Sequence, residues 1–319
     1  MSAPCADTMP GQRGVALITI MLIVALLTLI VSRVGLSGQI WVRQVENANA
    51  YTQAELTARA TQAWVADILE QDKNNLDGWT DLWAQPLPPM PVEQGILSGR
   101  IEDMQSRFNL NNLVNADGKV DGQALQQFER LLTLLELDPG IAQAVIDWID
   151  TDGSPAGPSG AEDVYYLGLV QGYLAANRPF EDTAELRLVR GIDRAAWNKL
   201  SPLVSALPGT VTLNVNTASA EVLAAALTDL DLSGQALPMA QKWVEQAVTE
   251  PVEDMQQFIS QIYGEQAAQV PPGLGLVSDY FTAHTRLDFN QVNYQVASLY
   301  RRSQGKAMLI SHRRELGQP

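Results

Sequence analysis

The sequence has 319 residues, 36 of them acidic and 21 basic, and a formal net charge of −15. A chain this acidic repels nucleic acid, so no nucleic-acid partner is expected. The one cysteine, Cys5, excludes an intramolecular disulfide. The two histidines, His284 and His312, leave almost nothing from which to build a histidine metal site or a Ser-His-Asp triad. The sequence therefore does not predict an enzyme.

The first distinctive segment runs from Val15 to Val31 and carries no charge over its 17 residues. This length is at the short end of what crosses a bilayer core, and it exceeds most signal-peptide cores. Gly35-Leu36-Ser37 could serve as a cleavage site, so a secretion signal remains an alternative. Apolar residues nevertheless continue at helical spacing as far as Leu69. This predicts one helix over 15–73, about 88 Å long at ~1.5 Å per residue.

Residues 74–110 are predicted to form a loop and the first strand of a sheet domain. Asn74, Asn75 and the prolines between Pro86 and Pro91 forbid a helix, whereas Gly95–Met104 has a strand pattern. Helical patterns then dominate residues 111–275 and predict an inserted all-α domain. The expected helices cover 125–135, 139–149 with Asp138 as its cap, 181–189, 194–203, 220–227, 239–247 and 254–263.

Residues 276–319 return to strand patterns. Apolar and polar residues alternate through YFTAHTRLDF, and two further strands are predicted in VNYQVASLYRR and KAMLISHRR, with both histidines exposed on strands. Three antiparallel strands need an apolar cover, which the amphipathic half of the long helix can supply. We therefore predict an α+β fold in which a long N-terminal helix packs on a small antiparallel sheet. The all-α domain is inserted after the first strand.

Arg13-Gly14-Val15, a basic residue and a glycine before an unbroken apolar helix, resembles the cleavage signal of type IV pilins and type II secretion pseudopilins. In that family a membrane peptidase cuts after the glycine and methylates the new N-terminus. The resemblance implies a leader of residues 1–14, cleavage between Gly14 and Val15, and retention of the helix as a membrane anchor. Most members have glutamate as the fifth mature residue, where Thr19 stands here.

The missing glutamate and the large insertion are similar to the K-type minor pseudopilins of the general secretion pathway. So are the stretches SRFNLNNLVN, DWIDTDGSPAGPSGAEDVYY, ELRLVRGID and LNVNTASAEVL. The resemblance implies a pilin-like fold, a single pass through the inner membrane and most of the chain in the periplasm. Arg13 before the span and Arg33 and Arg43 after it leave the orientation undecided by charge. The partners implied are the I-type and J-type minor pseudopilins, the major pseudopilin and the prepilin peptidase.

The stretch from Asp147 to Tyr166 is the best candidate for a ligand site. It contains no basic residue and five carboxylates, those of Asp147, Asp150, Asp152, Glu162 and Asp163. Hard cations such as calcium take six to eight oxygen ligands. The spacing does not fit an EF-hand, because Gly153 stands at the fourth place and Ala161 at the twelfth. The residues alone leave a solvated acidic loop as an alternative, whereas the resemblance implies bound calcium.

Leu213–Leu227 resembles the opening of helix-hairpin-helix modules, many of which bind DNA backbones, and Phe108–Val114 echoes it. Asn216 or Thr217 is the expected helix cap. The sequence that follows, TDLDLSGQAL, is acidic and lacks the paired glycines that present backbone amides to phosphate. We therefore interpret the segment as a packing motif.

The function implied by the resemblance is structural: a minor pseudopilin that caps the pseudopilus tip and helps initiate assembly for the export of folded exoproteins. An inserted domain of this size has a radius of gyration near ~15 Å, too large to repeat on bundled helices ~8–10 Å apart. Thr19 avoids the ~2.5–3.5 kcal/mol cost of an unpaired carboxylate in lipid. Trp41 is expected at the membrane interface or a subunit contact. The alternative is a membrane-anchored calcium-binding adaptor that recognises exoproteins.

Overall fold

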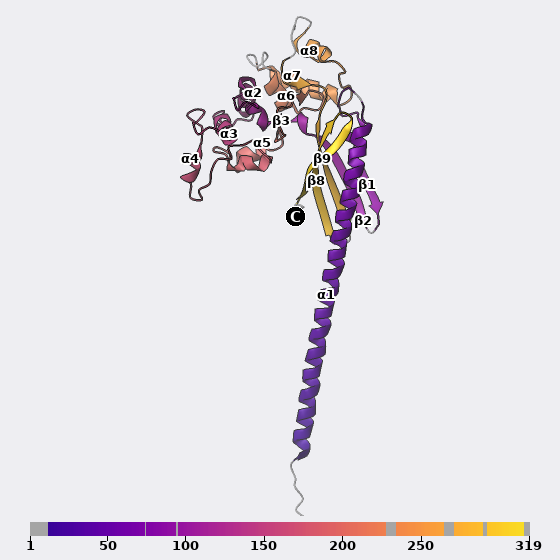
Figure 1. Ribbon diagram of the computed structural model, residues 1–319. Coiled ribbons are helices and arrows are strands. Elements are labelled where there is room, and N and C mark those ends of the chain that lie inside the picture. Colours follow the sequence, from indigo (N-terminus) through magenta and orange to yellow (C-terminus); the bar gives the residue numbers. More distant parts are fainter. Residues whose placement is uncertain are drawn as a thin grey trace, which may run out of the picture.

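The computed structural model describes residues 12–73, 75–93, 95–227, 234–264, 271–289 and 292–315. One long helix, α1 (Gln12–Gln71), leads into a sheet domain, and a helical domain lies beyond its C-terminal end and extends to one side of its axis (Figure 1). Residues 15–49 are exposed, and the most apolar window of α1 has a mean hydropathy of 2.9 with none of it buried. This half of α1 is long and apolar enough to cross a membrane.

The predicted helix is confirmed as one continuous element that passes through Gly35 without a break and ends two residues before the expected Lys73. The predicted leader is not tested. Residues 1–11 lie outside the described part of the chain, and so do the side chains of residues 12 and 13 and the exposure of Gly14.

The sheet has five strands in the order β1-β2-β7-β8-β9, each antiparallel to its neighbours. The strands are β1 (Leu87–Val92), β2 (Gly95–Asp103), β7 (Tyr280–Phe289), β8 (Val292–Ser303) and β9 (Lys306–Glu315). The three C-terminal strands confirm the prediction. The prediction of a loop over β1 was wrong, because β1 is an edge strand, where prolines are tolerated. The helical domain is therefore inserted after the second strand and not after the first.

One face of the sheet packs against the C-terminal half of α1. Ala54 and Ala58 contact Leu287 and Phe289 in one apolar cluster, and a second cluster forms further along the helix. The second cluster contains Val65, Leu69, Trp83, Phe281, Ala283 and Tyr300. Apart from Tyr280, the buried residues of β7 are those that the alternation placed on one side, so the amphipathic half of α1 is the predicted cover of the sheet.

Over its described residues, the inserted domain consists of short helices and four very short strands. Its elements are η2 (Met104–Ser106), β3 (Phe108–Asn109), η3 (Leu110–Leu113), α2 (Gly122–Leu134), α3 (Ile141–Ile149), α4 (Asp163–Leu167), η4 (Thr183–Leu188), α5 (Arg194–Leu200), β4 (Val204–Ser205), β5 (Leu213–Asn214), α6 (Ala220–Ala226), α7 (Ala236–Ala247), α8 (Met255–Tyr263) and β6 (Leu274–Gly275). Two predictions need correction. The segment 181–189 is a 3-10 helix, and the domain is not purely helical, because β3 pairs with β4 and β5 with β6. Two-residue strands are too short to leave a periodic pattern.

The two similar segments, Phe108–Val114 and Leu213–Leu227, form the same pair of hydrogen bonds at two places in the inserted domain. The side chain of Asn111 accepts a hydrogen bond from Phe180 N at 2.8 Å and donates one to Phe180 O at 3.0 Å. Asn216 makes the same pair of bonds with the backbone of Val252, at 3.0 and 3.1 Å. The prediction that Asn216 or Thr217 caps the next helix was wrong, because the N-cap of α6 is Ser219. These buried side chains are used for packing inside the domain.

Candidate functional site

The loop between α3 and α4 is folded by Asp147, in the last turn of α3. Its carboxylate accepts hydrogen bonds from two loop amides, Ala156 N at 2.7 Å and Ala161 N at 2.5 Å. Gly160 allows this approach, because a Cβ there would lie 2.3 Å from Asp147 Oδ2. Asp147 thus holds the loop back over the C-terminal end of α3.

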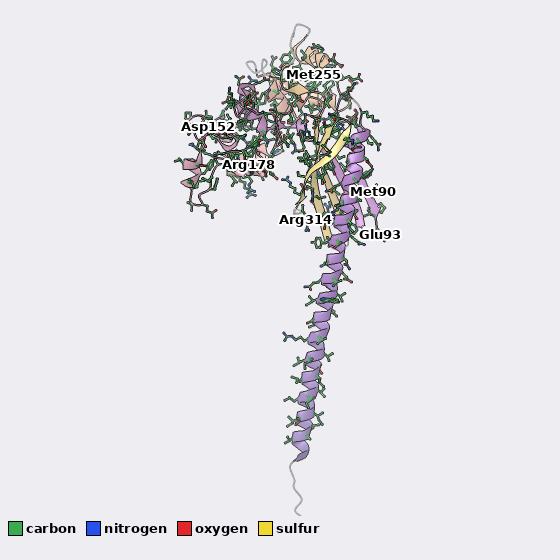
Figure 2. The ribbon with its side chains drawn as sticks, viewed as in Figure 1. Met90, Glu93, Asp152, Arg178, Met255 and Arg314 are labelled. Carbon is green, nitrogen blue, oxygen red and sulfur yellow. The ribbon has the colours of Figure 1, made fainter. Side chains whose placement is uncertain are left out.

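This fold brings three of the five predicted carboxylates together. Asp150, Asp152 and Glu162 each offer an oxygen, and these atoms all lie within 4.8 Å of one another. Asp150 and Glu162 are buried, whereas Asp152 is exposed near the extremity of the domain that carries α4 (Figure 2). Asp150 Oδ1 and Glu162 Oε1 have no hydrogen-bond donor within the described part of the chain. Buried carboxylate oxygens without a donor are costly, so the cluster requires protons or a cation.

Burial, and after it the neighbouring carboxylates, raises the pKa of Glu162 to about 7 and that of Asp150 to about 6. An all-oxygen donor set suits a hard cation, and Ca–O bonds of about 2.3–2.6 Å let oxygens up to ~5 Å apart share one ion. The three carboxylates therefore fit calcium, with carbonyls and water as further ligands.

The other two predicted ligands are not part of this convergent set. Asp147 is committed to the loop amides, and Asp163 Oδ1 accepts a hydrogen bond from Ala175 N at 2.9 Å. A residue that the sequence did not indicate supports the loop instead. Arg190 Nη1 donates to Gly160 O at 2.8 Å, and its guanidinium lies 4.9 Å from the centre of the Tyr165 ring. A lone arginine so far along the chain carries no sequence signal for this role.

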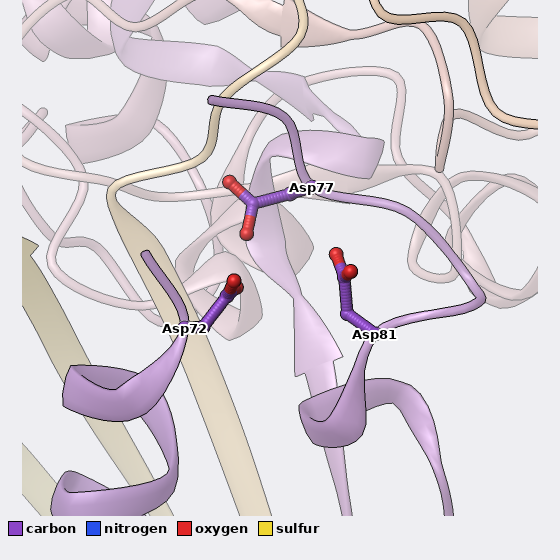
Figure 3. Close-up of side chains that lie close together, drawn as sticks. All are labelled: Asp72, Asp77 and Asp81. Atoms are coloured by element: carbon purple, nitrogen blue, oxygen red, sulfur yellow. The ribbon is translucent and has the colours of Figure 1, made fainter. Parts of the chain in front are cut away.

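A second acidic cluster, which sequence reasoning missed, lies where α1 ends. Asp72, Asp77 and Asp81 converge there (Figure 3). The chain supplies its own cation, because Arg302 of β8 donates to Asp72 Oδ2 at 2.8 Å and to Asp77 Oδ1 at 2.6 Å. Asp81 accepts the amide of Gly78 at 2.8 Å. This cluster is therefore a structural joint between α1 and the sheet.

A buried carboxylate beside this joint connects the sheet to the inserted domain. Asp103, at the end of β2, accepts hydrogen bonds from Thr217 Oγ1 at 2.5 Å, Ser278 Oγ at 2.7 Å and Asn214 Nδ2 at 3.1 Å. Burial raises its pKa, against the effect of these donors. The residues come from three distant parts of the sequence, so the network fixes the base of the helical domain.

The prediction that both strand histidines are exposed was wrong for His284. It is half-buried between two carboxylates, with Nε2 3.6 Å from Glu102 and Nδ1 3.4 Å from Glu315. The contact with His284, aided by Arg100 and opposed by burial, lowers the pKa of Glu102 to about 2. His312 is exposed, as predicted.

The part of the chain that contains the acidic loop matches a family of known proteins. A family model described as "Type II secretion system (T2SS), protein K" matches residues 106–209, which include the loop. The type II secretion system protein K of Pseudomonas aeruginosa is 40% identical over 228 residues, which are 67% of this chain and 68% of that protein. The chain belongs to the type II secretion system protein K family. Protein K of Aeromonas hydrophila is 31% identical over 95% of this chain and 96% of that protein.

The fold of this chain is confirmed by its likeness to a solved structure, the crystal structure of the GspK-GspI-GspJ complex from enterotoxigenic Escherichia coli. One of its chains aligns with a TM-score of 0.75 and 24% identity, covering 86% of this chain and all of that chain. The relatives are named as secretion-system proteins and not as enzymes, in keeping with a structural role.

The two residues predicted to act in assembly, Thr19 and Trp41, lie on α1, at a distance from the acidic loop. Thr19 Oγ1 donates to Val15 O, a carbonyl one turn back along the helix, at 2.7 Å. The Trp41 side chain is 66% exposed, so it is available to a membrane interface or another subunit.

Proposed function

We propose that the chain is a minor pseudopilin of a type II secretion system that caps the pseudopilus tip and helps initiate its assembly for the export of folded exoproteins. The apolar half of α1 anchors it in the inner membrane by a single pass, with the remaining domains in the periplasm. Its partners are I-type and J-type minor pseudopilins and the major pseudopilin. The solved complex, in which GspK occurs with GspI and GspJ, supports this assignment.

The observation that carries the tip assignment is the position of the helical domain. It lies beyond the C-terminal end of α1 and extends sideways from the helix axis (Figure 1). A domain of this size has a radius of gyration of ~15 Å, whereas packed helices lie only ~8–10 Å apart. Copies on every helix of a bundle would overlap, but one copy at an end has free space.

Thr19 supports the same assignment. Its hydroxyl is satisfied within α1 by the Val15 carbonyl, so it needs no polar group from a neighbouring subunit in lipid. A glutamate there would require a neighbour's N-terminal amine, and a subunit at the end of the bundle lacks a neighbour on one side. Thr19 therefore suits a terminal position.

The ratio of this chain to the major pseudopilin in sheared pseudopili, measured by quantitative mass spectrometry, tests the tip assignment. A tip subunit gives a ratio far below one, and a ratio near one overturns the proposal. Processing is tested separately by co-expression with a prepilin peptidase. A methylated Val15 at the mature N-terminus supports the pseudopilin assignment, whereas a cut near Ser37 assigns the chain to secreted proteins.

We also propose that the acidic loop binds calcium through Asp150, Asp152 and Glu162. Two buried carboxylate oxygens that have no donor among the described residues support this, and the set of candidate ligand atoms is entirely oxygen. Bound calcium supplies positive charge that compensates the buried carboxylates and joins the end of α3 to the start of α4. Asp147 and Asp163 shape the loop around the ion.

A further inference from the structure

The segment that follows the acidic loop exposes an unusual run of aliphatic side chains. Val164 is 87% exposed, Leu167 58%, Val170 106% and Leu174 57%, and Leu169 is also exposed. These five residues are called the α4 patch. They lie at one extremity of the helical domain, around α4 (Figure 1). Single exposed aliphatic residues are ordinary, but a contiguous group marks a site of interaction.

The patch is held in place by the aromatic residues between its members. Tyr166 is fully buried and contacts Trp148 edge-on, with ring centres 5.3 Å apart. Tyr173 stacks on Tyr166 at 5.2 Å and donates to Leu188 O at 2.7 Å. Tyr166 and Tyr173 thus face inward, whereas the aliphatic side chains of the patch face solvent. A preformed surface of this kind loses little conformational entropy on binding.

The charge beside the patch indicates what can cover it. Asp163 is the first residue of α4, and the charges of Asp150, Asp152 and Asp163 all act on the adjacent Glu162. The stretch 147–163 contains no basic residue, and a single divalent ion offsets only two of these four negative charges. Anionic phospholipid headgroups are repelled by such a border, whereas lysine and arginine are attracted to it.

We propose that the α4 patch docks a protein partner that presents aliphatic side chains bordered by lysine or arginine. The aliphatic groups cover Val164, Leu167, Val170 and Leu174, and the basic groups face the acidic loop. The proposal concerns the α4 patch alone and is independent of where the subunit lies in a pseudopilus.

The test uses the full chain in phosphatidylcholine nanodiscs and a fluorescent helical peptide of about 18 residues, built from leucine on one face and lysine on the other. Fluorescence anisotropy should show saturable binding that weakens as salt rises. Val170→Asp and Leu174→Asp should each weaken binding at least about tenfold. Val248→Asp is the matched control, because Val248 is 48% exposed at the end of α7. This variant should bind the peptide as tightly as the unaltered chain does.

The milder Val170→Ser keeps the test valid if an aspartate variant fails to fold. Equal binding by the Val170 variants and the unaltered chain would overturn the proposal. So would equal binding of a peptide in which glutamate replaces lysine. Co-sedimentation with phosphatidylglycerol vesicles that is lost in Val170→Asp would assign the patch to membranes instead.

Discussion

Arg302 and Asp77, separated by 225 positions in the sequence, form a buried ion pair in which Nη2 of the arginine donates to Asp77 Oδ1 at 2.6 Å. The Asp77 side chain is fully buried and that of Arg302 is 10% exposed. Arg302 also bonds Asp72, just after the end of α1, and its guanidinium lies 4.8 Å from the centre of the Phe281 ring. One side chain of β8 therefore fixes both the end of α1 and the loop that follows it.

Replacing Arg302 by methionine should destabilise the chain by about 3–5 kcal/mol, because it leaves the Asp77 carboxylate buried without its cation. The measurement is the urea midpoint of tryptophan fluorescence for the full chain in nanodiscs. Arg59→Met is the matched control: its partner Glu55 lies on the same helix, and both side chains are largely exposed, at 69% and 52%. That change should cost less than about 0.5 kcal/mol. Equal midpoints for the two variants would contradict the role given to Arg302.

Calcium should raise the melting temperature of the chain, and the effect should require Asp150 and Glu162. Free calcium at about 100 times its dissociation constant stabilises a folded protein by ~2.7 kcal/mol. Asp150→Asn and Glu162→Gln each remove a charged ligand and should abolish both the melting shift and the calcium that mass spectrometry detects after purification. Asp117→Asn, at an exposed position of the same domain, should keep both. Absence of calcium and of any shift in the unaltered chain would refute the site.

Calcium binding should weaken as the pH falls below about 7, the value to which burial raises the pKa of Glu162. Protons and calcium compete for Glu162 and for Asp150, whose pKa is about 6. The apparent dissociation constant by calorimetry should therefore rise about tenfold or more between pH 7.5 and pH 5.5.

The stability of the calcium-free chain should fall as the pH rises, whereas calcium affinity should increase. Because both pKa values are raised on folding, the two carboxyls favour the folded state below about pH 4, where they are protonated in both states. That contribution is lost as the pH rises through 6 and 7. Chelated protein should thus lose stability across this range relative to a Glu162→Gln variant. For the binding experiment at different pH, a calcium affinity that does not change with pH would show that Asp150 and Glu162 are not the ligands.

The sequence was sufficient for the elements whose pattern is long. The period of α1 and the alternation in β7 follow from local rules. The predicted cap Asp138 was wrong, because α3 begins at Ile141 and its N-cap is Gly140. Edge strand β1 was missed because Pro88, Pro89 and Pro91 indicate a loop, and only the position at the sheet edge makes them compatible with pairing. The two-residue strands depend on partners about 60 to 100 positions away.

The acidic loop was found from composition, but its geometry was not. All five carboxylates have the same chemistry in the sequence. Only the folded loop assigns Asp147 and Asp163 to backbone amides and Asp150, Asp152 and Glu162 to a common centre. The joint around Arg302 left no local signal, since its members come from the segment that follows α1 and from β8. Contacts of such long separation are set by tertiary packing.

Gly160 gives the sharpest test of how the loop is held. A Cβ at this position would lie 2.3 Å from Asp147 Oδ2 and 3.1 Å from Ala156 N. The Asp147 carboxylate cannot retreat without losing the amides of Ala156 and Ala161, so Gly160→Ala should open the loop and separate the three converging carboxylates. Calcium retention should be lost, whereas the whole chain is destabilised by only about 1–3 kcal/mol, as is usual for overpacking.

Gly153→Ala is the matched control in the same loop. A Cβ there meets nothing within 4 Å, so the change adds a methyl group in open space. It should leave calcium retention intact and, by restricting the unfolded chain, stabilise the protein by as much as ~0.4–1 kcal/mol. Circular dichroism melting curves with and without calcium, together with metal analysis, compare the two variants. If Gly160→Ala retained calcium as Gly153→Ala does, Asp147 would not be the residue that sets the shape of the site. The ion would then have to be held by carboxylates that converge without the folded loop.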